Sequence, residues 1–451
     1  MLERQSIDLL ANALEHLSDG FGMLPEFEAT VAGSKRMDRV LIETAARLQE
    51  NYPYFHPLYA GQMLKPPHPI ARAAYALAMW INPNNHALDG GRASSALERE
   101  AVAEIAAMFG WNEHLGHLTS GGTMANLEAL WVAGQMAPGK KIVASEQSHY
   151  THERISGVLK LPFEKAAVDA RGRMDAAALE AMAASGEIGC VVATMGTTGV
   201  GAVDPLPAIL ALREKYGFRV HVDSAYGGYF TLVENLGPEA RAGFDAAGQA
   251  DSIVIDPHKH GLQPYGCGCV LFRDPEVGRL YRHDSPYTYF SSKELHLGEI
   301  SLECSRAGAS ATALWATQKL LPLVRGGEFA EMLETSRRAA VRMAAGLRQR
   351  GFVVPFEPEL DIVVWAPKEA SASAASELSQ KIFDEAARQD LHLALIHLPV
   401  SFFGAAWPEL VKDRETVVSL RSVLMKPEHE AWVNEIVVRI AAVTEQVRRG
   451  R

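Results

Sequence analysis

The segment 251–261, Asp-Ser-Ile-Val-Ile-Asp-Pro-His-Lys-His-Gly, places an amine where it can react. Its β-branched run 252–255 predicts a buried strand, and Pro257 ends that strand because proline has no N–H to donate. Lys259 then lies at the carboxyl end of the strand, which is where open α/β sheets bind ligands. A lysine that is desolvated beside two histidines can act as an amine nucleophile. Taken alone, Lys259 fits better as a loop lysine that reaches solvent, so other groups must decide.

A glycine-rich turn offers a place for an anion. Ser120, Gly121, Gly122 and Thr123 lead directly into a helical pattern that begins at Met124. Glycines and hydroxyls at a helix start expose backbone N–H groups beside the positive end of the helix dipole, which suits a phosphate. The turn matches neither the Walker loop nor the dinucleotide-binding fingerprint. Many helices begin with Ser or Thr caps, so this feature is weak by itself.

A carboxylate and a histidine complete a set of groups that suits a flat, charged cofactor. Asp223 ends the predicted strand 219–223. A carboxylate there can keep a pyridine nitrogen protonated, which makes the ring an electron sink, as pyridoxal phosphate (PLP) chemistry requires. His149 can stack on the ring, and Lys259 can form a Schiff base with the aldehyde. Each residue alone has a simpler interpretation as a cap, turn or surface residue, but their joint occurrence favours PLP binding.

An alternation of strands and helices brings these groups together. Predicted strands cover 141–145, 188–194, 219–223, 252–256 and 268–272, and predicted helices cover 150–160, 175–185 and 205–216. This order predicts an α/β fold with a mostly parallel central sheet that is covered on both faces. His149, Thr198, Asp223 and Lys259 each follow one of the strands. We therefore expect them at one edge of the sheet.

Three units are expected along the chain. Residues 1–65 form an N-terminal segment with a helix over 5–17, followed by loop-like and extended stretches, and this helix suits packing on a partner subunit or the main body. Residues 66–325 form the large, PLP-binding domain. Residues 326–451 form a smaller C-terminal α+β domain. A tyrosine-rich loop over 278–300 is suited to close over a site.

The composition limits the classes of function. The 451 residues are 48% hydrophobic and 22% charged, which is typical of a soluble globular protein. A formal net charge of −10 argues against a nucleic-acid partner. No apolar run reaches the roughly 20 residues of a membrane span, and the first residues do not form a signal peptide, so we expect a cytoplasmic protein. Four cysteines fit as reduced thiols, and their spacing predicts no metal site.

Three strings of residues resemble those of the PLP-dependent group II amino-acid decarboxylases. They are Thr119-Ser-Gly-Gly-Thr123, His221-Val-Asp-Ser-Ala-Tyr226 and Asp256-Pro-His-Lys259. The resemblance runs from about residue 50 to residue 430. Within the family, four further segments look most like the bacterial tyrosine decarboxylase branch, which is related to the aromatic-L-amino-acid decarboxylases. These segments are 54–57, 82–85, 90–91 and 305–308.

The resemblance implies the fold of fold-type I PLP-dependent transferases and a homodimer with its active site at the subunit interface. It implies that Lys259 is the Schiff-base lysine, that Asp223 binds the pyridine nitrogen and that His149 stacks on the ring. A tyrosine of the mobile loop protonates the substrate carbon, and Tyr287 and Tyr289 are the candidates. The remaining cofactor contacts implied are Ser120, Gly121, Gly122, Thr123, Thr198, Ala225 and His258.

The resulting hypothesis is a decarboxylase that converts an L-amino acid to the amine and CO₂. Aromatic residues near position 54 favour tyrosine, DOPA, phenylalanine or tryptophan, whereas polar residues near position 86 leave glutamate or aspartate open. An aminotransferase stays open because Arg421 can clamp an α-carboxylate, and a retro-aldol lyase shares the lysine, the aspartate and the glycine-rich turn. The predicted substrate-binding residues are Tyr54, Phe55, His86 and Arg421.

Overall fold

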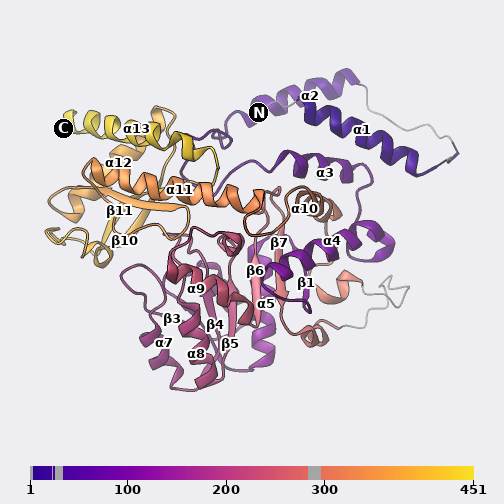
Figure 1. Cartoon of the computed structure of the whole chain (residues 1–451), viewed down its shortest axis with the longest axis horizontal. Coiled ribbons are helices and arrows are strands. Elements are labelled where there is room, and N and C mark those ends of the chain that lie inside the picture. The colour runs from indigo at the N-terminus through magenta and orange to yellow at the C-terminus, as the bar shows by residue number, and fades with distance from the viewer. Residues whose placement is uncertain (1–3, 23, 26–33, 283–295, 451) are drawn as a thin grey trace.

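The structure is a computed structural model that describes residues 4–22, 24–25, 34–282 and 296–450. Two β-sheets organise it (Figure 1). A seven-stranded sheet forms the centre of the larger body, and a four-stranded sheet with three long helices forms a smaller body beside it.

The large sheet has the strand order β1-β7-β6-β5-β4-β2-β3. Its strands are β1 (Leu115–Thr119), β2 (Lys141–Ser145), β3 (Phe163–Ala166), β4 (Ile188–Thr194), β5 (Arg219–Asp223), β6 (Ser252–Ile255) and β7 (Gly268–Phe272). Strands β3, β2, β4, β5 and β6 pair in parallel, and only β7 runs antiparallel to its neighbours β6 and β1. The sheet is therefore mostly parallel, as the sequence predicts.

Helices cover both faces of this sheet. Alternate residues of β4 point to opposite sides: Cys190 and Val192 pack with helix α5, whereas Val191 and Ala193 pack in the core that includes helix α8. The helices of the large body are α3 (Pro69–Met79), α4 (Leu88–Met108), α5 (Gly122–Met136), α6 (Thr151–Leu159), α7 (Ala176–Ala183), α8 (Leu206–Tyr216), α9 (Pro238–Ala246) and α10 (Gly308–Leu320). Short 3₁₀ turns lie at η1 (Gly228–Leu232), η2 (Ala247–Gln249), η3 (Pro275–Leu280) and η4 (Leu297–Ile300).

The small sheet is antiparallel, with the order β10-β11-β9-β8. Its elements are α11 (Glu328–Gln349), β8 (Phe352–Val353), β9 (Ile362–Pro367), α12 (Ala372–Arg388), β10 (Ala394–Pro399), η5 (Val400–Phe403), β11 (Thr416–Val423) and α13 (His429–Arg449). Trp365 is fully buried between this sheet and the helices. The α+β pattern agrees with the expectation for this part of the chain.

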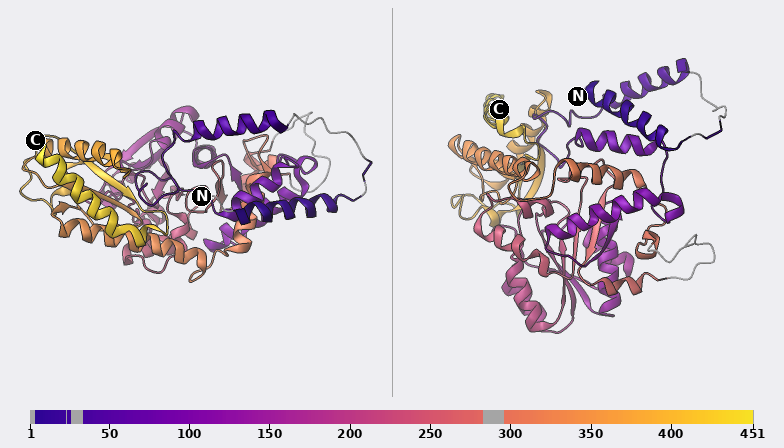
Figure 2. Two further views of the ribbon diagram at one scale, coloured as in Figure 1. Left: turned by 90° about the horizontal axis from the view of Figure 1, so that it is seen from above. Right: turned by 45° about the vertical axis from the view of Figure 1, so that its right-hand side comes forward.

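The N-terminal helices lie apart from both sheets. α1 (Arg4–Gly20) packs against α3, and in the view from above α1 and α2 (Ser34–Leu48) run on two sides of the molecule (Figure 2). Every side chain of residues 35–48 is exposed. The loop-like interpretation of the segment after residue 22 is wrong for 34–48, because an amphipathic helix forms there. The sequence interpretation also missed the short strands β1 and β3.

Within the described ranges, every helix is too short or too polar to span a lipid bilayer.

Candidate active site

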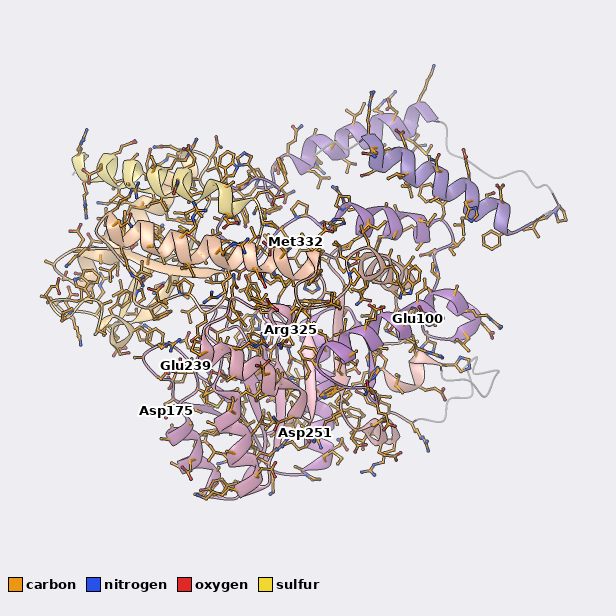
Figure 3. All side chains as sticks on the ribbon, in the orientation of Figure 1. Glu100, Asp175, Glu239, Asp251, Arg325 and Met332 are labelled. Atoms are coloured by element: carbon orange, nitrogen blue, oxygen red, sulfur yellow. The ribbon has the colours of Figure 1, made fainter. Side chains whose placement is uncertain are left out.

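A polar cavity of about 320 Å³ opens at the carboxyl ends of the parallel strands. Figure 3 labels Asp251, which directly precedes β6, and Asp256, which directly follows this strand, lines the cavity. Each of the central strands β2, β4, β5 and β6 is followed by residues that line the cavity. The lining residues are Ser120, Gly121, Gly122, Thr123, Met124, Asn126, His149, Thr151, Thr194, Gly196, Thr198, Asp223, Ala225, Tyr226, Asp256, His258 and Lys259.

Lys259 reaches the cavity from the turn that follows β6. Its backbone N–H donates to the carbonyl of Asp256 at 2.9 Å, which closes the turn. Its Nζ lies 3.1 Å from Oδ2 of the same residue, and the lysine side chain is 22% exposed. The other oxygen of Asp256 is buried without a hydrogen-bond partner among the described residues. The amine is thus held by a carboxylate at the edge of the cavity and is accessible from it.

Asp223, the last residue of β5, presents a buried carboxylate to the same cavity. Its Oδ1 accepts the backbone N–H of Ala225 at 3.1 Å, and its Oδ2 lies 2.8 Å from Nε2 of His152. Burial by itself raises the pKa of Asp223, but the hydrogen bond and charge of His152, the N–H of Ala225 and the Lys259 cation outweigh burial. The pKa is therefore below its ordinary value, and the carboxylate is ionised.

The start of α5 forms the third side of the cavity. Gly121 is its N-cap and provides no side-chain hydrogen bond, so the first-turn N–H groups are not capped by that residue. A Cβ at Gly122 would lie 2.6 Å from the carboxylate of Asp256, so only glycine fits this close approach. The 15-residue helix directs its positive end into the cavity. This combination suits an anion such as a phosphate.

Two histidines line the cavity in uncharged form. The ring of His149 is held by a hydrogen bond between its Nδ1 and the hydroxyl of Thr151 at 2.7 Å. Burial lowers the pKa of His149 and of His258 below the ordinary value. Ala225 is 9% exposed and offers a small apolar surface. A protonated, flat ring that contacts His149 and Ala225 would therefore meet no second positive charge from these two residues.

Comparison with known proteins decides the family. The family model of the pyridoxal-dependent decarboxylase conserved domain matches residues 50–368, more than half of the chain. The chain belongs to this family. It is a PLP-dependent amino-acid decarboxylase, and the prediction from its sequence strings is confirmed.

Relatives and solved structures support this assignment. The L-tyrosine decarboxylase of Enterococcus faecium is 28% identical, over 83% of this chain and 79% of that protein. The probable L-aspartate decarboxylase of Halobacterium salinarum is 31% identical, over 71% of this chain and 86% of that protein.

Two crystal structures share the fold. Oryza sativa TDC with PLP and tryptamine has a TM-score of 0.77 and 17% identity, and the match covers 97% of this chain and 96% of that one. Mouse CSAD has a TM-score of 0.76 and 20% identity, with 96% and 91% covered. The prediction of a fold-type I architecture is confirmed.

The charged and polar groups of this decarboxylase's cavity match the groups of PLP. The uncapped start of α5 suits the phosphate, Lys259 suits the aldehyde, and the ionised Asp223 suits a protonated ring nitrogen. Nδ1 of His258 and Oδ1 of Asp256 are also buried, and neither has a hydrogen-bond partner among the described residues. A ligand in the cavity could bind to them.

All ten residues predicted to contact the cofactor line this one cavity: Ser120, Gly121, Gly122, Thr123, His149, Thr198, Asp223, Ala225, His258 and Lys259. The sequence interpretation placed four of them, His149, Thr198, Asp223 and Lys259, at the ends of separate strands and placed Ser120 to Thr123 at a helix start. Their individual roles stay predictions. The two candidate proton donors, Tyr287 and Tyr289, lie outside the described residues.

The four predicted substrate-binding residues do not line the cavity of this chain. Arg421 comes nearest: it donates to the carbonyl of Thr198 at 2.9 Å and to the side chain of Gln62 at 2.5 Å. Tyr54 packs edge-on against Tyr59, with ring centres 4.9 Å apart.

Phe55 and His86 also lie outside the cavity lining. Phe55 is 47% exposed. The carbonyl of His86 accepts the N–H of Gly298 at 2.9 Å, which places it beside η4.

Several residues of the site were not assigned a role from the sequence, and three of them make informative contacts or line the cavity. Asp256 pairs with Lys259, Tyr226 lines the cavity, and His152 holds Asp223. A signal for His152 was present, because it follows the ring-stacking candidate His149 by only three residues, in the first turn of a helix. Nothing local in the sequence pairs His152 with a residue 71 positions away.

Proposed function

We propose that this enzyme decarboxylates an aromatic L-amino acid, as a homodimer. The observation that carries the reaction is the convergence of an amine, an ionised carboxylate and an uncapped helix start on one cavity. Membership in the decarboxylase family favours loss of the carboxylate over the aminotransferase and retro-aldol alternatives.

Different residues of the cavity have different roles in the proposed reaction. When bound, PLP supplies an electron sink that accepts the electron pair released as the carboxylate leaves as CO₂. Asp223 holds a proton at the ring nitrogen, and Lys259 provides the amine for covalent attachment. His149 and Ala225, which both line the cavity, would contact the ring. A loop tyrosine, Tyr287 or Tyr289, returns a proton to the substrate carbon.

An aromatic segment supports the substrate class. The rings of Tyr52, Tyr54 and Tyr59 form a cluster with His392. This cluster continues along the chain to Gln62, which binds Arg421, and Arg421 binds Thr198 at the cavity wall. Arg421 therefore links the segment that contains these aromatic residues to the cavity wall, through its hydrogen bonds to Gln62 and Thr198. The name of the Enterococcus faecium relative, a tyrosine decarboxylase, agrees with this class.

Aspartate is the second candidate substrate. The Halobacterium salinarum relative, which is named a probable L-aspartate decarboxylase, is 31% identical to this chain. A substrate with a second carboxylate would need a cation, and Arg421 is a buried cation that donates to Thr198 at the cavity wall.

The N-terminal helices support the homodimer. Large apolar side chains are exposed on both α1 and α2, where a monomer gains nothing from them. They are Ile7, Leu9, Met37, Val40, Leu41, Ile42 and Leu48. A second copy of the chain would cover these faces.

The test is a decarboxylation screen of the full-length enzyme with added PLP over tyrosine, DOPA, phenylalanine, tryptophan, aspartate and glutamate. We expect CO₂ and the matching amine from an aromatic substrate. Lys259→Ala should reduce the rate to background, because the covalent attachment point is lost, while circular dichroism shows an unchanged fold. Turnover of aspartate or glutamate alone would refute the aromatic assignment, and a keto acid product would refute decarboxylation.

A further inference from the structure

His152 is fully buried at the start of α6, one helical turn after His149. Its backbone N–H donates to the carbonyl of His149 at 3.1 Å. Its Nε2 lies 2.8 Å from Oδ2 of Asp223, which is 71 residues away in the sequence. The start of α6, which closely follows the ring-stacking candidate in the chain, thus contributes a direct contact to a carboxylate that lines the cavity.

The two oxygens of Asp223 are held from different directions. Oδ1 accepts the N–H of Ala225 in the turn after β5, and Oδ2 is bonded by His152 from α6. A carboxylate has about four acceptor positions, so two bonds leave capacity for a third donor from the cavity. With one anchor on each oxygen, the carboxylate cannot turn away from the cavity without breaking a bond.

His152 also keeps this carboxylate charged. A carboxylate that is 5% exposed would ordinarily become neutral, because burial penalises the ionised form. A protonated Asp223 would carry no negative charge to stabilise a protonated ring nitrogen. The pKa of Asp223 nevertheless lies below its ordinary value, with the hydrogen bond and charge of His152 as the main opposing causes after burial.

Neighbouring histidines do not share this task. His221 lies on the same strand as Asp223, but its two nitrogens contact Asn126 and Ser252, each at 2.8 Å. His149 is bonded to Thr151. In the part of the chain that the structure describes, no other side chain hydrogen-bonds to Asp223.

We propose that His152 is a positioning residue for the cofactor: it fixes and ionises Asp223 so that this carboxylate recognises the ring nitrogen of PLP. The proposal rests on the proposed role of Asp223 as the partner of that nitrogen. His152 itself touches neither cofactor nor substrate.

The experiment measures the affinity of the cofactor-free protein for PLP and for its carba analogue, in which C–H replaces the ring nitrogen. Wild type should prefer PLP by about tenfold or more, since a hydrogen bond to a charged group contributes on that scale. His152→Leu should reduce the preference to less than about threefold. His152→Gln retains an N–H of similar reach and should restore most of it.

A matched control uses a second buried pair. His117 Nε2 lies 3.0 Å from Oε2 of Glu128, both side chains are fully buried, and neither lines the cavity. His117→Leu should destabilise the protein in the same general way as His152→Leu but should retain the wild-type preference for PLP. A general folding defect therefore cannot imitate the expected result.

The outcomes separate this inference from the proposed function. If Asp223→Asn abolishes the preference and His152→Leu retains it, the role of His152 is refuted and that of Asp223 stands. If Asp223→Asn retains the preference, the role of Asp223 is refuted, and the proposal for His152 fails with it. Loss of preference in both variants, with recovery in His152→Gln, supports the proposal.

Discussion

Two buried aspartate–histidine pairs lie near the cavity, and they differ in what their carboxylates face. Asp223 and His152 are 2.8 Å apart, and Asp223 lines the cavity. Asp361 and His260 are 3.2 Å apart, both side chains are fully buried, and neither lines the cavity. The first carboxylate keeps one side open to a ligand, whereas the second is enclosed by protein.

The enclosed pair joins the small body to the large one. Asp361 directly precedes β9 of the small sheet, and its carbonyl accepts the N–H of Leu424 at 2.9 Å. Its Oδ1 accepts the hydroxyl of Tyr226, which lines the cavity, at 2.6 Å. His260 follows Lys259 in the chain. Asp361 therefore connects the small sheet to both the turn that carries the lysine and the turn after β5.

Electrostatics explains how an aspartate–histidine pair can either face a ligand or connect two parts of the protein. Burial alone raises the pKa of Asp361, but the charge and hydrogen bond of His260 and the hydroxyl of Tyr226 outweigh it and lower the pKa. Burial lowers the pKa of His260. Asp361 is thus a carboxylate that accepts the hydroxyl of Tyr226 and lies beside the imidazole of His260. What distinguishes the cavity pair is the acceptor capacity left over for a ligand.

Removing the enclosed carboxylate should have the largest effect, and on stability. Asp361→Ala leaves the buried hydroxyl of Tyr226 without an acceptor and removes the carboxylate that lies 3.2 Å from Nε2 of His260. We expect the free energy of unfolding of the cofactor-free protein to fall by about 3–5 kcal/mol, as for a buried pair that loses one partner. Urea denaturation measures it. Asp361→Asn keeps an acceptor oxygen and should lose less than half as much free energy of unfolding. Equal stability of Asp361→Ala and wild type would contradict the role of Asp361 in joining the two bodies.

Removing the charge of the open carboxylate should act on catalysis instead. Asp223→Asn keeps the size of the side chain but cannot stabilise a protonated ring nitrogen. We expect the decarboxylation rate with saturating PLP to fall on the order of 10²–10³-fold, the cost of losing a preorganised electrostatic contact. Asp361→Asn, measured beside it, should stay within about tenfold of wild type. A similar loss of rate in both variants would erase the distinction between the pairs.

The sequence predicted the open site better than the joint. Strand-end positions indicated that His149, Asp223 and Lys259 converge, because parallel strands place their carboxyl ends at one sheet edge. The pairing of Asp361 with His260 crosses from one sheet to another, and no local pattern encodes such a contact. Helix α2 was missed, although it is amphipathic and its periodicity is a signal for a helix.

The smallest expected effect is on how the free energy of unfolding falls at acidic pH. Because the pKa of His260 is lowered in the folded state, the unfolded chain binds more protons below about pH 6.5, the ordinary value. The contribution of His260 is therefore complete above that pH and is lost as the pH falls. His260→Phe should make the loss of unfolding free energy between pH 6.5 and 5 shallower, by at most about 1.4 kcal/mol per pH unit.

Urea titrations of the cofactor-free protein across this range measure the slope. Other buried histidines, such as His221 and His429, each with a pKa lowered to about 3 by burial, keep the remaining slope in place. Phe230 packs edge-on against the ring of His260 at 5.1 Å, so Phe230→Leu disturbs the same packing without removing a titrating group. That variant should shift stability equally at every pH. An unchanged slope in His260→Phe would mean that the imidazole is not held neutral in the joint.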